Sequence, residues 1–323
     1  MTPGGGGLAI ALGTDDGVWI LENGRCAPSL LRGAEVSHIS IRNGTILAAV
    51  PRDGLYRVTK HKVDLIWKGD ARACAIGFQG TYYLGIEPAM VYRSDDQGEN
   101  WVRLSQIDKL PTRNNWYFPP PPHEPHVRSI DFLDGNDGNV IVGIEVGGVL
   151  ISSNYGETWE ELNCGIDIDV HTVRPDPGNS DHLIAVTGGG VYISEDQGLL
   201  WTNVTEGLSQ GYAVGLHIKP DSTGEVLLTT GEKPPGLNAQ LYHSRNGGKS
   251  WNRLEPPELP NHYNRVPVVL FAEGCAWVAT DQGEVFKAHD VLGPWEFVCK
   301  IPSVIYTASH EGSPSSVSSG FRG

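Results

Sequence analysis

The chain has 323 residues, a formal net charge of −14 and a sequence pI near 5.2. So acidic a chain does not suit nucleic-acid backbones or anionic membrane surfaces as main partners, because both require a basic face. No run of 18 or more apolar residues is present, so we expect neither a nucleic-acid partner nor a membrane span.

The N-terminal segment, "MTPGGGGLAIALGTDDG", contains a strand candidate but no basic start and only a short apolar stretch. A secretory signal needs both features, so we expect a cytoplasmic protein. The cysteines are odd in number and lack CxxC spacing: Cys26, Cys74, Cys164, Cys275 and Cys299. This pattern favours reduced thiols over a disulfide framework or a zinc site.

Four segments further along the chain repeat one pattern: "YRSDDQGENWVRL" from residue 92, "LISSNYGETWEEL" from 150, "YISEDQGLLWTNV" from 192 and "YHSRNGGKSWNRL" from 242. Each has Ser, any residue, Asp or Asn, any residue, Gly, two more residues and then Trp. The Asp or Asn can bond the amides of its own turn, while Gly supplies a positive φ. The pattern therefore predicts a tight turn between two strands, with the Trp packing the second strand against a neighbour. A degenerate copy, "FKAHDVLGPWEFV", begins at Phe286.

The repeat length predicts the fold. The tryptophans at 101, 159, 201, 251 and 295 lie 58, 42, 50 and 44 positions apart, and repeats of this size built from short strands are typical of β-propellers. The N-terminus lacks an innermost strand, and "SVIYTASHEG" after Pro302 can supply it. We predict an all-β, seven-bladed propeller closed by a C-terminal strand that completes the first blade. The expected blades are 8–34 plus 303–310, 35–70, 71–107, 126–163, 169–208, 212–259 and 263–302, with a disordered tail at 311–323.

The Ser/Asp turns resemble the Asp box, or BNR repeat, of a propeller family that includes sialidases, sortilin-type receptors and photosystem assembly factors. The resemblance covers essentially the whole chain and implies the fold; it does not imply an activity, because the turn is structural. A sialidase would use three arginines, a tyrosine and an acid, and Tyr306 is available, but the "RIP" motif is absent and sialidases are six-bladed. A W-x-F-P-P stretch, "HVRSI" and "IEVGG" resemble one group of uncharacterised cytoplasmic Asp-box proteins.

Two insertions point to one face of the ring. The Ser/Asp turns join the third and fourth strands of each blade and define a bottom face. The insertion 108–125, "DKLPTRNNWYFPPPPHEP", and the insertion 232–240, "EKPPGLNAQ", both fall in connections of the opposite, top face. Long loops around the channel mouth commonly carry function. We expect the Pro-rich arm 108–125 to form a lid with Trp116 and Phe118, although it could instead plug the channel.

The ends of the second strands and the starts of the first strands meet at this top face. The second strands bring mainly charged residues, among them Glu87 and Glu145, which we predict as a carboxylate pair whose mutual repulsion raises one pKa. With His126 and His171 they are the proposed catalytic residues. The proposed substrate-binding residues are Arg128, Arg52, Arg265, Trp116, Phe118, Glu232 and Asp281. Alternatively, these charged residues form only a solvated rim without a function of their own.

Three functions remain open. The first is acid/base chemistry, such as hydrolysis or elimination, on a small polar or anionic substrate. The second is a non-catalytic scaffold that holds a peptide or protein partner at the top face. The third is a metal-dependent enzyme in which converging imidazoles bind a divalent ion; its predicted ligands are His38, His126, His171 and His217. No nucleotide cofactor is expected, because the Gly-rich "VTGGGV" is not followed by a helix.

Overall fold

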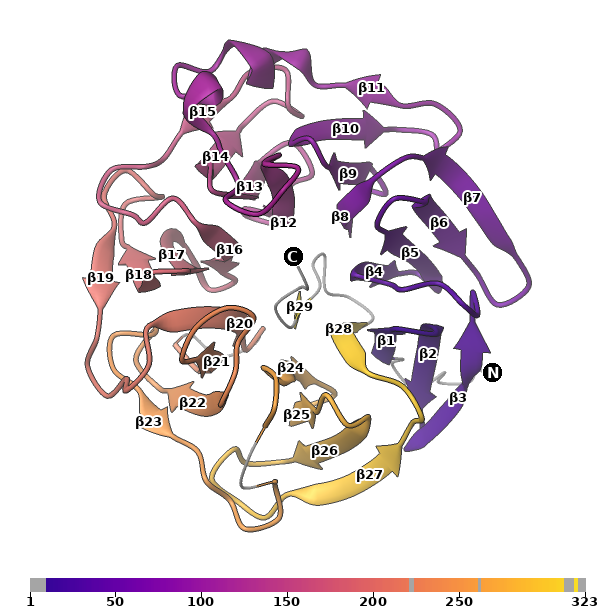
Figure 1. Cartoon of the computed structure of the whole chain (residues 1–323), viewed down its shortest axis with the longest axis vertical. Helices are drawn as coiled ribbons and strands as arrows, with labels where there is room; N and C mark the ends of the chain where they lie inside the picture. The colour runs from indigo at the N-terminus through magenta and orange to yellow at the C-terminus, as the bar shows by residue number, and fades with distance from the viewer. Residues whose placement is uncertain (1–9, 221–223, 261–262, 311–316, 319–323) are drawn as a thin grey trace, which may run out of the picture.

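The computed structural model describes residues 10–220, 224–260, 263–310 and 317–318. Seven antiparallel sheets stand in a ring (Figure 1). This arrangement confirms the predicted seven-bladed β-propeller. Among the described residues, no helix has the length and apolar character that a membrane crossing requires.

Each blade runs from an innermost to an outermost strand. Blade 1 is β28 (Ile305–His310), β1 (Ile10–Thr14), β2 (Gly17–Glu22) and β3 (Arg25–Leu30); blade 2 is β4 (His38–Arg42), β5 (Thr45–Val50), β6 (Gly54–Val58) and β7 (Val63–Lys68); blade 3 is β8 (Ala71–Ile76), β9 (Tyr82–Ile86), β10 (Met90–Ser94) and β11 (Val102–Arg103). Blade 4 is β12 (His126–Phe132), β13 (Val140–Glu145), β14 (Gly148–Ser152) and β15 (Glu160–Glu161); blade 5 is β16 (Val170–Asp176), β17 (Asn179–Thr187), β18 (Gly190–Ser194) and β19 (Thr202–Val204). Blade 6 is β20 (Tyr212–Ile218), β21 (Val226–Gly231), β22 (Gln240–Ser244) and β23 (Asn252–Arg253); blade 7 is β24 (Val268–Ala272), β25 (Cys275–Ala279), β26 (Glu284–Ala288) and β27 (Glu296–Lys300).

The two ends of the chain close the ring in blade 1. Strand β28 pairs with β1, with Ala308 opposite Leu12, as the missing first strand predicts. A short strand, β29 (Val317–Ser318), pairs with the other edge of β28 and lies inside the ring (Figure 1). The predicted disordered tail 311–323 otherwise falls outside the described residues.

Outer strands of blades 1 and 7 are joined by a disulfide between Cys26 and Cys299. The prediction of five reduced thiols is therefore wrong for this pair, while Cys74, Cys164 and Cys275 are free. The two cysteines are 273 residues apart in sequence. They meet because ring closure sets β27 beside β3, a proximity that cysteine spacing cannot show.

The Ser/Asp turns make the hydrogen bonds that their sequence predicts. In the first, the Ser94 hydroxyl donates to the Asp96 carboxylate (2.8 Å) and accepts from the Gly98 amide (2.8 Å). The Trp that follows can bond the preceding blade: Trp201 Nε1 donates to the Leu162 carbonyl at 2.8 Å. These turns lie on the bottom face and tie neighbouring blades together.

A second set of links joins the innermost strands of adjacent blades. Here a side chain on one strand accepts a hydrogen bond from a backbone N–H on the next, which compensates for the missing ladder between separate sheets. The Cys74 amide donates to His38 Nδ1 at 3.2 Å, and the Phe271 amide donates to His217 Nδ1 at 3.2 Å. Ser129 accepts in the same way from the Val173 amide. These side chains are thus part of the structure of the ring.

Candidate functional site

The predicted charged residues of blades 3 and 4 meet at the top face, where the second strand of each blade ends and the first begins. Glu87 follows β9, and Glu145 ends β13 opposite His126, the first residue of β12. A bulge between Val127 and Ser129 interrupts the pairing of β12 just after this point. Glu87, His126 and Glu145 therefore meet at the top face because each stands at the end of a strand there.

They form a continuous chain of ion pairs across the two blades. Arg72 reaches Glu87 at 2.9 Å, and Glu87 lies 3.3 Å from His126 Nδ1. On the other side of the imidazole, His126 Nε2 lies 3.0 Å from Glu145. Glu145 also contacts Arg128 Nε at 2.9 Å. We call Arg72, Glu87, His126, Glu145 and Arg128 the ion-pair chain.

The ion-pair chain fixes the charges of its members. Burial acts to raise the pKa of Glu145, but the charges of Arg128 and His126 outweigh it and hold this pKa well below its usual value. Burial likewise opposes, without reversing, the lowering of the Glu87 pKa by His126 and Arg72. The pKa of His126 is raised, because Glu145 and Glu87 outweigh the effect of burial.

The predicted repulsive carboxylate pair is therefore wrong in its electrostatics. His126 stands between Glu87 and Glu145, so each carboxylate meets a cation rather than the other carboxylate. Both have lowered pKa values, whereas a general acid at neutral pH needs a raised one. Carboxylates with lowered pKa values suit recognition and structure better than proton transfer.

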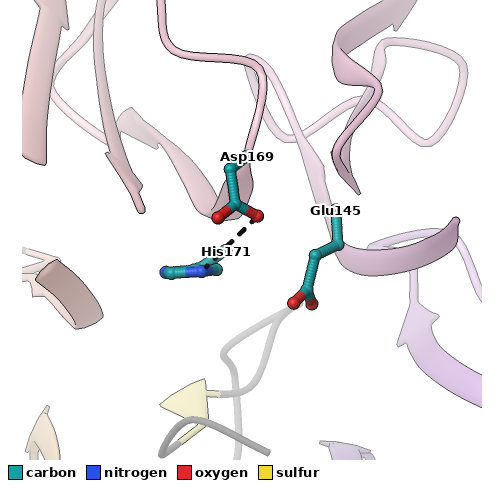
Figure 2. A group of neighbouring side chains, drawn as sticks. All are labelled: Glu145, Asp169 and His171. Carbon is teal, nitrogen blue, oxygen red and sulfur yellow. Dashed lines mark ion pairs between the residues drawn. The ribbon is translucent and has the colours of Figure 1, made fainter. Parts of the chain in front are cut away.

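A second group adjoins the ion-pair chain at blade 5. His171, on β16, is 1% exposed, and its Nε2 lies 3.8 Å from Asp169 Oδ1. The ligand atoms of Glu145, Asp169 and His171 all lie within 4.8 Å of one another, and Figure 2 shows the three side chains turned toward one another. Burial raises the pKa of Asp169 and lowers that of His171. Tyr212 packs edge-on against the imidazole, with 4.9 Å between ring centroids.

Arg72 and Asp169 are the site residues that the sequence analysis missed. Arg72 is the second residue of β8, and Asp169 lies in the connection between β15 and β16, directly before Val170, the first residue of β16. The signal that could have found Asp169 is its position two residues before His171 in "DIDVH". Residues at this spacing point to the same side of an extended segment.

The Pro-rich arm lies on blade 4 and divides its aromatic residues between packing and exposure. Trp116 is buried, and its Nε1 donates to the Thr112 hydroxyl at 2.9 Å. Phe118 covers His126 edge-on, with 5.3 Å between centroids, whereas Tyr117 is 51% exposed. Trp116 is therefore a buried packing residue and not an exposed lid residue. Phe118 covers the ion-pair chain as a lid residue would.

The remaining predicted binding residues lie on the rim of other blades. Arg52 has an exposed side chain, and its amide donates to Asp70, the residue that also pairs with Arg72. Arg265 is half-buried just before β24 in blade 7. Glu232 is exposed and accepts from Asn238, and Asp281 is half-buried after β25. No contact between these four side chains and the ion-pair chain is present among the described residues.

The four predicted metal-binding histidines do not converge. His38 and His217 each accept an amide hydrogen bond from the next blade. His217 is the sixth residue of β20, so it lies roughly 16 Å along the strand from the top face. Its placement at a strand start was wrong because β20 begins at Tyr212. His126 bridges two carboxylates, which leaves His171 beside acids instead of other imidazoles.

Comparisons with known proteins place the chain among seven-bladed propellers. Photosystem II assembly lipoprotein Ycf48 of Synechococcus sp. (strain CC9902) is 23% identical over 246 residues, which cover 76% of this chain and 67% of that protein. Xyloglucanase Xgh74A of Acetivibrio thermocellus is 24% identical over 255 residues, but these span only 29% of the enzyme. No family model matches the chain.

Solved structures give the same result at the level of the fold. The structure described as YCF48 bound to D1 peptide aligns with a TM-score of 0.59 and 16% identity, covering 90% of this chain and 95% of that one. The GH74 xyloglucanase from Xanthomonas campestris aligns with a TM-score of 0.66 and 15% identity over 95% of this chain and 52% of the enzyme. The expected likeness to an assembly-factor propeller is confirmed; that to sialidases and sortilin-type receptors stays a prediction.

Proposed function

We propose that this protein is a binding propeller that holds a segment of a partner protein on its top face. The observation that carries the proposal is the ion-pair chain. Glu87 and Glu145 are each paired with cations and have lowered pKa values. Side chains paired and buried in this way are poorly suited to proton transfer, and they hold the top face above them rigid, which favours binding.

The rim suits a basic partner segment. Acidic residues follow the second strands of four other blades on the same face, three of them exposed and Asp281 half-buried: Asp15, Asp53, Glu232 and Asp281. Electrostatic complementarity with Lys and Arg residues would guide such a segment and set its register. Next to the ion-pair chain, the exposed Tyr117 stacks on His123 with 5.0 Å between centroids and offers a rigid aromatic contact.

The similarity to Ycf48 supports this proposal. The structural alignment covers nearly all of both chains, and that structure is described as bound to D1 peptide. A propeller with the same fold is therefore described with a peptide bound. The identity of this protein's own partner is a separate question, because 16% identity conveys the fold alone.

Selection of peptides from a random displayed library, followed by calorimetry with the synthetic peptides, tests the proposal. We expect Lys- and Arg-rich peptides whose Kd rises about tenfold in the rim variant Glu232→Gln/Asp281→Asn, since each charge contact contributes up to about 1 kcal/mol. A bottom-face variant with the same charge change, Asp134→Asn/Glu157→Gln, should bind as the wild type does. Peptides without basic residues, or equal losses in both variants, would contradict the proposal.

The similarity to xyloglucanases favours a second candidate, glycoside hydrolysis. In this chain the acid would be Asp169, whose Oδ1 is buried and has no hydrogen-bond partner among the described residues. Release of reducing ends from xyloglucan, abolished in Asp169→Asn with an unchanged thermal transition, would support hydrolysis. Absence of any release by the wild type would remove this candidate.

A further inference from the structure

We infer that Glu145, Asp169 and His171 form a binding site for one divalent transition-metal ion, such as Zn²⁺ or Mn²⁺. The inference goes beyond partner binding and does not depend on it. The ligand atoms of the three side chains come from neighbouring blades and all lie within 4.8 Å of one another (Figure 2). The argument rests on which atoms of these side chains are free to accept a cation.

The tautomer of His171 is fixed by the backbone. Its Nδ1 lies 2.6 Å from the carbonyl oxygen of Ala213, and a carbonyl can only accept, so Nδ1 carries the proton and donates. A neutral imidazole then has its lone pair on Nε2. A histidine whose other nitrogen donates to a backbone carbonyl is the usual arrangement at metal centres, because the hydrogen bond orients the ring.

The free lone pair of His171 faces another acceptor. Nε2 lies 3.8 Å from Asp169 Oδ1, and both atoms are buried without a hydrogen-bond partner among the described residues. The imidazole as a whole is 1% exposed. Two buried acceptors facing each other cost free energy unless a cation or a donor lies between them.

Glu145 retains capacity for a further cation. Its two ion pairs, with His126 and with Arg128, both reach the same oxygen, Oε2. Among the described residues no ion pair reaches Oε1. Arg128 and His126 hold the carboxylate in place through Oε2. Its other oxygen, Oε1, can therefore bind an ion with little further loss of side-chain freedom.

The Asp169–His171 separation fits an ion after a small adjustment, and the Glu145 ligand atom, within 4.8 Å of the other two, has to move closer as well. Two donors at about 2.1 Å from one ion lie roughly 3.0–3.5 Å apart, slightly less than the 3.8 Å between Asp169 and His171. Asp169 has the freedom to close this gap, because its side chain is 36% exposed and stands on the connection before β16. The same exposure gives an ion access from the top face.

The donor set indicates the class of ion. One imidazole nitrogen with two carboxylates suits Zn²⁺, Mn²⁺ and similar first-row ions, whereas Ca²⁺ prefers six to eight oxygen ligands and Cu⁺ prefers sulfur. Three protein ligands leave at least one coordination position for water or for a carboxylate of a bound molecule. The open position of the ion would then offer a Lewis-acidic point on the otherwise acidic top face.

Calorimetric titration of the chelator-treated full chain with ZnCl₂ and with MnCl₂ tests the inference. We expect one ion per chain and at least tenfold weaker binding in Asp169→Asn and in His171→Gln. Asp134→Asn removes the same charge from the exposed connection between β12 and β13 on the bottom face, and should bind as tightly as the wild type. Circular dichroism of each variant establishes that the fold is kept.

Crystals soaked with ZnCl₂ give a second measurement that needs no variant. An anomalous peak bonded to Asp169 and His171 supports the site, whereas a stoichiometric ion elsewhere overturns it. Absence of stoichiometric binding, or unchanged affinity in Asp169→Asn, also overturns it. Peptide binding measured in chelator is independent of these outcomes, so failure of one proposal does not affect the other.

Discussion

The two faces of the ring are built by opposite means. On the bottom face, one turn recurs with the same bonds: the Ser hydroxyl accepts from the Gly amide at 2.8 Å in the blade 3 turn and 3.0 Å in the blade 6 turn. On the top face, the side chains at the strand ends vary from blade to blade: Glu87 follows β9 and Glu145 ends β13, whereas Thr187 ends β17. The repeated turns of the bottom face therefore hold the ring together, and the varied strand ends of the top face form the candidate site.

The histidines of the innermost strands show the same contrast at the level of single bonds. His38 and His171 each bond the next blade through Nδ1, but His38 accepts from the Cys74 amide and His171 donates to the Ala213 carbonyl. The first bond uses the Nδ1 lone pair within the structure. The second leaves the Nε2 lone pair of His171 turned toward Asp169. The direction of one hydrogen bond thus distinguishes a structural histidine from a candidate ligand.

The largest expected effect lies in the ion-pair chain. Glu145→Gln leaves Arg128 and His126 beside a neutral amide in a buried place, and breaking a buried pair in this way costs roughly 3–5 kcal/mol of unfolding free energy. Urea unfolding measures the loss. On the bottom face Asp196→Asn, which also removes one charge, should change stability little, because Asn occupies the same position at 154 and 246. Equal stability of Glu145→Gln and the wild type would show that the chain of charges is not structural.

A smaller effect depends on pH and tests the structural histidines. Burial, reinforced by the charges of Arg174 and Arg128, lowers the pKa of His38 to about 3. As pH falls below about 6.5, the unfolded chain takes up a proton at His38 while the folded chain does not, so the folded state loses stability. The contribution is fully present above pH 6.5, and about 2 kcal/mol of it is lost between pH 7 and pH 5.

The variant His38→Gln isolates this contribution. Its unfolding free energy should fall about 2 kcal/mol less than that of the wild type between pH 7 and pH 5, as measured by urea unfolding at both values. His61→Gln, in an exposed turn, should follow the wild type. A pH dependence of His38→Gln identical to that of the wild type would mean that the pKa of His38 is the same in the folded and the unfolded chain, which would contradict the prediction.

The ring was predictable from the sequence because its determinants are local. The Ser/Asp turns recur at regular spacing, and the N-terminus visibly lacks one strand, which β28 supplies. The meeting of Glu87, His126, Arg128 and Glu145 was also predictable, because first-strand starts and second-strand ends share one face.

The remainder required three-dimensional information. His126 stands between Glu87 and Glu145, a side-chain placement that the order of the strands does not give, and this contact reverses the expected pKa shift. His217 was misplaced because no turn residue marks where β20 begins. Asp169 lies outside the repeated strand positions on which the prediction was based, and the Cys26–Cys299 disulfide depends on ring closure.

The smallest expected effect separates two tryptophans of the repeated turn. Trp201 Nε1 donates to Leu162, whereas the buried Nε1 of Trp159 has no hydrogen-bond partner among the described residues. Both side chains are buried, so Trp→Phe removes a similar apolar area at each position. Trp201→Phe also leaves the Leu162 carbonyl unpaired, which should cost about 1 kcal/mol more than Trp159→Phe in urea unfolding. Equal losses would mean that apolar packing of the indoles holds the bottom face together. The blade-to-blade hydrogen bond would then contribute nothing measurable to the free energy of unfolding.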